Sequence, residues 1–322
     1  MSTTTLTRSG QQAGRMSRAQ VSLWSVVAWE IRRLSASRLF WCQSLGLLGL
    51  LLLLTWALHA PSQINAAHAV GSQQAKEALN AFVAGTSPGG LLRTLPTLLL
   101  VLVLMLPFVS ADGVTRDVTR RTHELVVTTP VPTWAYVWGR YLSALATSLG
   151  LALLLLLALI ATGEVLHLTI ADYPAPVIGG TLLLWVGMVI PATVLVCSVG
   201  FALSTLAPRL SMLVKVVILV AWMVGALVIP LSMGDSPNPP TWYVDWDPTS
   251  GITAAGLLGP YAVHLGPSIA SEASLQQLLL SVENKIPTTA GWLVPHLLLI
   301  LPALLLVLIA SLGYRRRRDV LS

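Results

Sequence analysis

Charged side chains are scarce in this 322-residue chain. Asp, Glu, Lys and Arg together make up 10% of the residues, and hydrophobic residues make up 55%, whereas a typical soluble domain has about 25% charged residues. Cysteine is scarcer still, because only Cys42 and Cys197 occur, and both lie inside long apolar runs. Their positions fit neither a disulfide framework nor a metal site, so we expect both to be packing residues.

Acidic side chains are absent from the interior of every long apolar run, since Asp112 and Glu164 lie at the ends of runs. A carrier driven by an ion gradient needs ionisable groups near the middle of the membrane, and the sequence argues against that class. The chain also has only three lysines, Lys76, Lys215 and Lys285, and none of them follows a glycine. A Walker loop requires Gly-Lys-Ser/Thr, so any ATP must be bound by another subunit.

Catalytic patterns are missing as well. His123-Glu124 begins like the zinc-protease motif, but Val127 stands where the second histidine ligand is needed, and one histidine on a helix cannot hold zinc in that way. His296 is the histidine nearest to being buried, and we interpret it as an interfacial residue. We therefore expect no catalytic residue, no metal and no cofactor in this chain.

Six apolar stretches, in contrast, are long enough to cross a bilayer, whose core needs about 20 apolar residues in a helix. The stretches are roughly Phe40–His59, Leu92–Ala111, Tyr141–Thr162, Val177–Thr205, Met212–Met233 and Trp292–Leu312. Prolines inside three of them predict kinks, at Pro96, Pro107, Pro191, Pro295 and Pro302. The fold class that follows is an all-α polytopic membrane protein with six transmembrane helices.

The basic residues predict one orientation for these helices, because Lys and Arg stay on the cytoplasmic face. Six arginines precede the first stretch, four lie between the second and third, two basic residues lie between the fourth and fifth, and Arg315–Arg318 follow the last. Only Lys76, Arg93 and Lys285 fall on the other side. Both termini are therefore expected in the cytoplasm, in the inner (cytoplasmic) membrane. This orientation explains the net charge of +6 without nucleic-acid binding.

The chain divides into four predicted segments. Residues 1–19 form a disordered cytoplasmic tail, 20–39 an interfacial elbow helix, 40–314 the six-span domain, and 315–322 a basic cytoplasmic tail. In the elbow helix, Trp24, Val27, Ile31 and Leu34 recur at helical spacing beside arginines, which is typical of an amphipathic helix in the membrane interface. A cytosolic helix packed on another subunit is the alternative.

The external loop, about residues 234–291, is predicted to hold short helices in the outer leaflet. Asp247-Pro248 predicts an N-cap followed by proline at the first helical position, with the helix ending near Gly259-Pro260. Leu275, Leu278, Leu279 and Val282 predict a second short helix. An interfacial aromatic belt is expected from Trp242, Tyr243, Trp246 and Trp292.

The densest polar segment, about residues 113–128, lies between the second and third stretches. Val114, Val118, Thr122 and Leu125 share one side of a predicted helix, and the charged residues Arg116, Asp117, Arg120, Arg121 and Glu124 lie mainly around the rest. Thr128-Thr-Pro130-Val-Pro132 breaks this helix. Thr133 then caps a new helix, which enters the third stretch through Gly139-Arg140-Tyr141.

This part of the sequence resembles the pattern of type-2 ABC exporter permeases. It has an acidic residue leaving the second span, an Arg- and Glu-bearing segment ending in Glu-Leu, a Thr-Pro-Val turn, and an aromatic-Gly-Arg entry into the third span. The layout of interfacial helix, six spans and short external helices is similar too. The resemblance implies that residues 113–128 form a coupling helix docked on a cytoplasmic ATPase subunit, which binds ATP and Mg. The implied contacts are Arg116, Asp117, Arg120, Arg121 and Glu124.

On this resemblance the chain is the permease subunit of an exporter that moves a hydrophobic or amphipathic substrate outward, paired with a second permease subunit, identical or not. A plainer interpretation of residues 113–128 is a solvated loop whose arginines only set topology. At the level of function, the alternative is a non-transporting membrane scaffold or mechanotransmission subunit coupled to an ATPase. The acidic loop 234–291 could then dock an extracytoplasmic partner.

Overall fold

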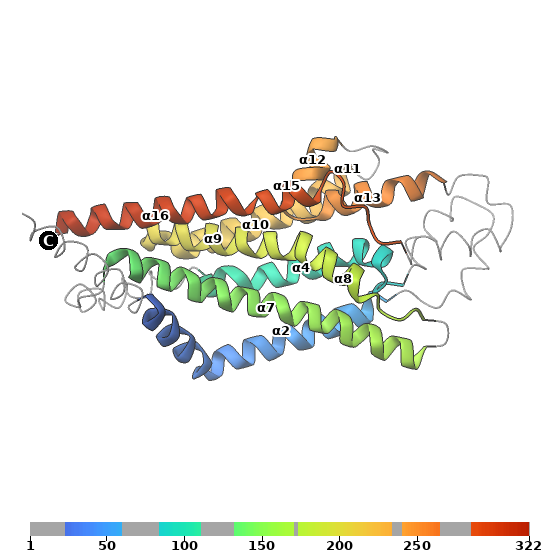
Figure 1. Ribbon diagram of the computed structural model, residues 1–322, viewed down its shortest axis with the longest axis horizontal. Coiled ribbons are helices and arrows are strands. Elements are labelled where there is room, and N and C mark those ends of the chain that lie inside the picture. Colours follow the sequence, from blue (N-terminus) through green and yellow to red (C-terminus); the bar gives the residue numbers. More distant parts are fainter. Residues whose placement is uncertain are drawn as a thin grey trace, which may run out of the picture.

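The computed structural model describes residues 23–59, 84–110, 132–170, 173–233, 240–264 and 285–321. Within these ranges every regular element is a helix, and none is a strand. Six of the helices are long and apolar enough to cross a membrane, and they run along the long axis of one bundle (Figure 1). The chain is therefore an all-α multi-pass membrane protein, as the sequence predicts.

All six predicted stretches are confirmed as helices. The spans are α2 (Arg38–Ala57), α4 (Pro88–Ser110), α7 (Thr133–Thr169), α8–η2–α9 (Ile178–Leu184, Trp185–Val189, Ile190–Leu206), α10–η4–α11 (Ser211–Met223, Val224–Val228, Ile229–Met233) and α15–α16 (Leu293–Leu298, Ile300–Leu321). The shorter helices are residues 23–35, η3 (Pro208–Leu210), α12 (Thr241–Trp246) and α13 (Gly251–His264). α7 begins at Thr133, which was predicted to cap the helix that enters the third stretch, and it extends past the predicted Thr162 to Thr169. α16 continues through the arginines expected to form a tail.

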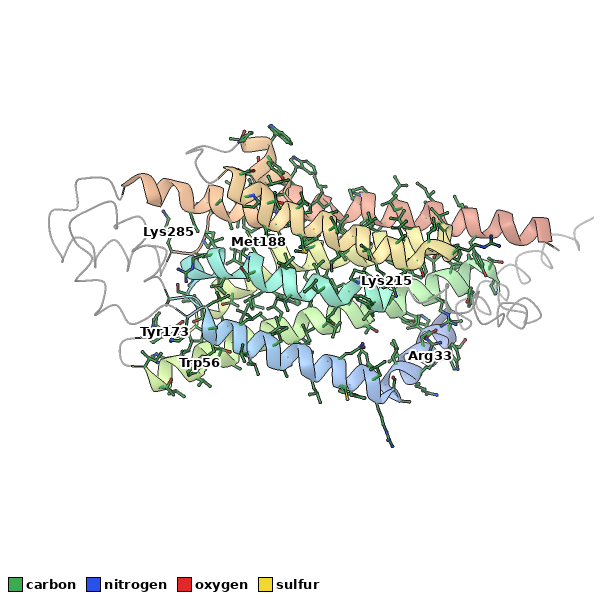
Figure 2. The ribbon with its side chains drawn as sticks, turned by 180° about the vertical axis from the view of Figure 1, so that it is seen from behind. Arg33, Trp56, Tyr173, Met188, Lys215 and Lys285 are labelled. Carbon is green, nitrogen blue, oxygen red and sulfur yellow. The ribbon has the colours of Figure 1, made fainter. Side chains whose placement is uncertain are left out.

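The two ends of the bundle differ in charge. One end holds helix 23–35, the starts of α2 and α7, and the C-terminus (Figure 1), and we call it the basic end. Its described basic residues include Arg32, Arg33, Arg38, Arg140 and Arg209. At the opposite end, which we call the loop end, lie α12, α13 and Lys285, and Figure 2 shows Lys285 and Arg33 at opposite ends of the molecule.

The core runs through α4 and α9. Leu95, Leu98 and Leu102 of α4 are fully buried, and they belong to one apolar cluster with residues of α2, α7 and α9. The outer faces of α2, α10 and α16 expose large apolar side chains, as expected where lipid replaces water. Cys197 is buried in the bundle, but Cys42 is exposed on α2, so the prediction that Cys42 is a packing residue was wrong.

Two spans widen into a π-helix just before a proline. The N–H of Ile190 donates to the carbonyl of Trp185, five residues back, and Pro191 follows. A proline ring clashes with the carbonyl four residues earlier, and the π-turn, which bonds i to i+5, moves that carbonyl aside. The same arrangement occurs in η4, where the N–H of Ile229 donates to Val224 before Pro230.

The other predicted kinks differ in outcome. α4 runs through Pro96 and Pro107 as one helix. In the last span the helix breaks between Pro295 and Pro302, at Leu299, which separates α15 from α16. Proline therefore interrupts the fourth and sixth spans as predicted, while α4 stays continuous.

The glycine of each π-helix makes room for a side chain from the loop end. A Cβ on Gly187 would lie 2.7 Å from the Trp292 ring, and a Cβ on Gly225 would lie 2.8 Å from Thr249. Trp292 is 1% exposed, and its Nε1 donates to the carbonyl of Thr288 at 2.6 Å. Trp292 therefore belongs to the core, and its predicted place in an interfacial belt was wrong.

Replacing Gly187 with Ala is expected to lower the free energy of unfolding by about 1–3 kcal/mol, because the added methyl overpacks against Trp292. The matched change is Gly150→Ala in the middle of α7, where a Cβ meets nothing within 4 Å. This control is expected to be neutral or slightly stabilising, since alanine favours helix over glycine. Thermal unfolding of both purified variants measures the difference, and equal midpoints would contradict the assigned contact.

Asp247 organises the loop end as a helix cap. Its carboxylate accepts hydrogen bonds from the backbone N–H of Thr249 at 2.9 Å and of Ile252 at 2.7 Å, and from the Thr249 hydroxyl at 2.7 Å. Ser250 adopts a positive φ of 64°, which a right-handed helix cannot contain. The helix therefore begins at Gly251, later than predicted from Pro248, and it continues past Pro260 to His264.

Candidate site at the basic end

The predicted ATPase-coupling residues lie outside the described residues. These are Arg116, Asp117, Arg120, Arg121 and Glu124, together with the rest of residues 111–131. The structure does place the two points at which this segment joins the bundle. α4 ends at Ser110 and α7 begins at Thr133, both toward the basic end (Figure 1). α4 and α7 are therefore the two described helices to which this segment is joined along the chain.

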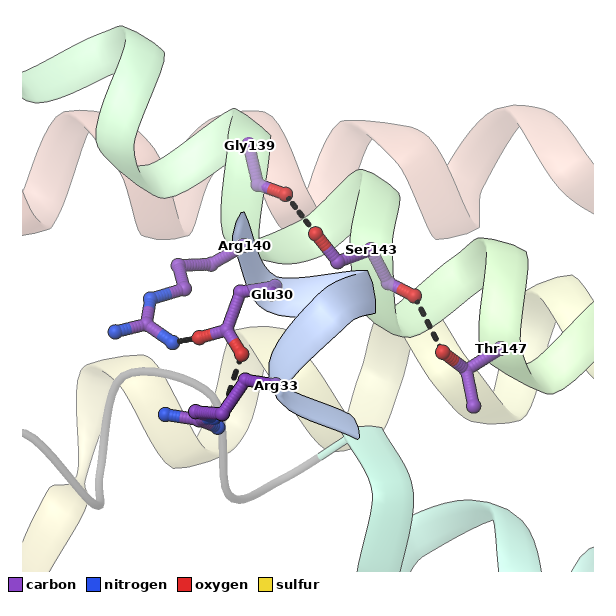
Figure 3. A network of polar contacts seen from close by, with 6 residues as sticks. All are labelled: Glu30, Arg33, Gly139, Arg140, Ser143 and Thr147. Carbon is purple, nitrogen blue, oxygen red and sulfur yellow. Dashed lines mark hydrogen bonds and ion pairs between the residues drawn. The ribbon is translucent and has the colours of Figure 1, made fainter. Parts of the chain in front are cut away.

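A buried ion pair joins the start of α7 to helix 23–35. The Arg140 guanidinium pairs with the Glu30 carboxylate, and Arg33 donates to the same carboxylate at 2.9 Å (Figure 3). The side chains of Arg140 and Glu30 are only 3% and 4% exposed. An ion pair at this depth is costly to break, because the charge that loses its partner stays out of water.

Aromatic rings flank the two guanidinium groups. The Trp29 ring centroid lies 5.3 Å from Cζ of Arg33 and 5.1 Å from Cζ of Arg140. The Tyr136 ring lies 5.4 Å from Cζ of Arg140. These distances are within the range of about 6 Å for a cation–π interaction. We call Trp29, Glu30, Arg33, Tyr136 and Arg140 the basic-end joint.

Helix 23–35 approaches α7 closely at Gly139. A Cβ at this position would lie 2.8 Å from Cγ1 of Val26 and 3.4 Å from the carbonyl oxygen of Leu23. The missing side chain allows the two helices to come close enough for Glu30 to reach Arg140. This gives a structural reason for the Gly-Arg pair at the entry of the third span.

The same turns of α7 also contact α9 and α16. The Tyr136 ring lies 6.3 Å from the ring of Tyr314 in α16. The Tyr141 hydroxyl is 2.8 Å from the hydroxyl of Ser198, and its ring is 5.5 Å from Phe201, both on α9. A movement of the start of α7 therefore acts directly on helix 23–35, α9 and α16.

Reasoning from sequence did not identify Glu30. The apolar residues that predicted an amphipathic helix include Trp24 and Ile31, which are exposed, whereas Val27 and Glu30 are buried. The available signal was that Glu30 is the only carboxylate in the arginine-rich segment before the first span, three residues before Arg33. The exposed apolar side chains suit a membrane interface, and that location of the helix stays a prediction.

His296 belongs to a second polar cluster, at the loop end. It is buried, its Nδ1 is 2.9 Å from the Trp292 carbonyl, and its Nε2 is 3.5 Å from the Thr253 hydroxyl. The Thr253 hydroxyl also donates to the carbonyl of Val244 in α12. His296 is thus a buried structural residue, and the interfacial interpretation was wrong. Within the described ranges, no three His, Cys, Asp or Glu residues are grouped closely enough to hold a metal ion.

No protein-family model and no curated protein matches this chain. The fold itself defines the class, a multi-pass membrane protein with six helices long and apolar enough to span a bilayer. Its distinguishing feature at the basic end is the joint around the Glu30–Arg140 ion pair.

Proposed function

We propose that this chain is the transmembrane permease subunit of an ATP-driven ABC exporter and moves a hydrophobic or amphipathic substrate outward. On this proposal the basic end faces the cytoplasm, because arginine-rich ends of spans stay on that side. Both termini then lie in the cytoplasm, and the protein resides in the inner (cytoplasmic) membrane. The observation that carries the proposal is the basic-end joint, which sits where residues 111–131 enter the bundle.

The joint suits a subunit that receives force from a partner. Arg140 lies seven residues after the start of α7 at Thr133, or about two helical turns. Its pairing with Glu30 ties those turns to helix 23–35, and only Ala36 separates that helix from Ser37, the N-cap of α2. A displacement applied at residues 111–131 would therefore move α7 and α2 together instead of bending α7 alone.

The partners follow from the same proposal. Two cytoplasmic ATPase subunits would bind ATP and Mg, and a second permease subunit, identical or not, would complete the transport path. The segment 113–128 would be the coupling helix, with Arg116, Asp117, Arg120, Arg121 and Glu124 contacting the ATPase. Clustered charges can form several interfacial ion pairs, which give register and specificity to such a contact.

A second candidate function is a non-transporting subunit that transmits ATPase-driven motion to an extracytoplasmic partner. The loop end favours this alternative in one respect, because α13 is firmly capped by Asp247. Trp242 and Trp246 of the neighbouring α12 are exposed there. Exposed aromatic side chains on a rigid support are the kind of residue that protein partners bind.

Reconstitution separates the two functions. The chain is purified with its ATPase, incorporated into liposomes, and supplied with ATP and a fluorescent phospholipid analogue in the leaflet at the basic end. ATP-dependent movement of the analogue to the other leaflet is expected, and a hydrolysis-deficient ATPase is the matched control. A stable extracytoplasmic partner without flux would instead favour mechanotransmission. Full-rate flux without any hydrolysing subunit would refute the exporter proposal.

A further inference from the structure

A cavity of about 180 Å³ lies among α2, α4 and α7. Its lining includes Phe40 and Leu47 from the first half of α2, and Met105 and Val109 from the last two turns of α4. These turns place the cavity in the half of the bundle that contains the basic end. Gln43 and Phe108 also line it and are exposed, so the cavity opens sideways on the lipid-facing surface.

Ser44 provides a polar group inside this apolar cavity. It lines the cavity and is 7% exposed, yet its hydroxyl has no hydrogen-bond partner among the described residues. Some buried helix hydroxyls are satisfied within their own helix, since Thr55 donates to the carbonyl of Leu51 and Ser143 to that of Gly139, four residues back. Ser110 and Thr193, like Ser44, have no such partner, but of these three only Ser44 lines the cavity. A buried hydroxyl without a partner is costly, and a polar group on a bound molecule would remove that cost.

A buried cation lies beside the cavity. The Lys215 ammonium is 5.1 Å from the ring centroid of Phe108, the residue at the cavity mouth. Lys215 is buried in α10, and Figure 2 places it in the same half of the bundle as Arg33. Arg38, the first residue of α2, is exposed and lies two residues before Phe40 of the cavity lining. Positive charge therefore lies close to an opening whose interior is almost entirely apolar.

We propose that this cavity binds one alkyl chain of an anionic membrane lipid taken from the leaflet at the basic end. The apolar lining accepts the chain, the Ser44 hydroxyl bonds a polar group near its head, and the positive charge of Lys215 and Arg38 favours an anionic headgroup. Lipid is the molecule that fills the bilayer beside a sideways opening, so it is the occupant that this location favours. That this lipid is also the transported substrate rests on the proposed function.

Photolabelling in nanodiscs tests the site without ATP or an ATPase. The probe is phosphatidylglycerol with a diazirine in its acyl chain, and labelled peptides are mapped by mass spectrometry. Label is expected around Phe40–Leu47 and Met105–Val109. Ser44→Trp fills the cavity and is expected to reduce this label about tenfold, equivalent to about 1.4 kcal/mol. The matched control is Leu45→Trp, which adds the same indole at a neighbouring exposed position of α2.

Two further variants keep the test decisive if Ser44→Trp does not fold. Met105→Trp fills the same cavity from α4 and is expected to reduce the label similarly. Lys215→Gln is expected to remove the preference for phosphatidylglycerol over phosphatidylcholine in competition, whereas Lys215→Arg keeps it. Equal label in the cavity-filling variants and the control, or label spread over all lipid-facing helices, would overturn the proposal. Binding without ATP-driven flux would refute the exporter function but leave this site intact.

Discussion

Reversing the charges of Arg120 and Arg121 together, as Arg120→Glu and Arg121→Glu, is expected to abolish the stimulation of ATP hydrolysis that the proposed function predicts for this chain and its ATPase. Both arginines belong to the proposed coupling helix, and each reversal turns an attraction to the partner into repulsion. Losing one buried interfacial charge pair costs about 2–5 kcal/mol, which is at least about thirtyfold in affinity. The hydrolysis rate of the co-reconstituted subunits, compared with the ATPase alone, measures the effect.

The control must separate docking from topology, because arginines also orient the spans. Arg317→Glu with Arg318→Glu makes the same change in charge on the same side of the membrane, outside the coupling segment. Membrane-impermeant thiol labelling of Ser35→Cys, in a background without Cys42, reports whether orientation is kept. Unchanged stimulation in a correctly oriented Arg120/Arg121 variant would remove the docking role from these residues.

Replacing Glu30 with Gln is expected to lower the free energy of unfolding by about 3–5 kcal/mol, because Arg140 would stay buried without its counter-charge. The amide keeps the shape of the carboxylate, so the loss reports charge and not packing. Arg140→Lys is expected to be destabilising too, since an ammonium cannot reproduce the planar contacts of a guanidinium with Trp29 and Tyr136. Denaturant or thermal unfolding in detergent, followed by tryptophan fluorescence, measures both changes.

The matched control is Glu164→Gln, which removes an exposed carboxylate from the other end of α7 and is expected to have little effect. The charge-swapped double variant, Glu30→Arg with Arg140→Glu, tests the pairing itself. It is expected to be more stable than the sum of the single changes Glu30→Arg and Arg140→Glu predicts, because opposite charges again face each other beside Arg33. A double variant as unstable as the sum of its single changes would show that the two residues are not coupled.

The spans were predictable because length and hydropathy suffice in a membrane. No other structure satisfies the backbone of a long apolar run in lipid, so each stretch had to be a helix. Their limits were less predictable, since the ends depend on neighbours. α7 begins at Thr133, the residue predicted to cap it, although Pro132 holds the N-cap position and no side chain caps the helix. At its other end α7 continues to Thr169, beyond the predicted Thr162.

The candidate site was predictable only in part. Gly139-Arg140 stood out as an entry motif, but the partner Glu30 lies more than a hundred residues away along the chain. Local patterning cannot report such a pairing, because the apolar spacing of Trp24 and Ile31 identifies a face exposed to the membrane interface and says nothing of the face that carries Glu30. The coupling contacts at residues 113–128 stay a prediction, because they fall outside the described residues.

At the loop end, prediction from the sequence failed for a different reason. Asp247 was expected as a cap, and it does cap α13, but the positive φ of Ser250 delays the helix by several residues. Trp292 and His296 looked interfacial because they open an apolar run. Trp292 is buried because Gly187, in a π-helix, leaves space for its indole, and a π-helix cannot be recognised from hydrophobic periodicity alone.

The length of α7 determines how motion passes from one end of the bundle to the other. Its 37 residues correspond to about 55 Å, while the hydrocarbon layer is about 30 Å thick. An unbroken helix of that length can tilt as one rigid body, and a tilt about its middle moves its two tips in opposite directions. Motion imposed at Thr133 would reach Thr169 on the far side reversed in sense and without relay by any other helix.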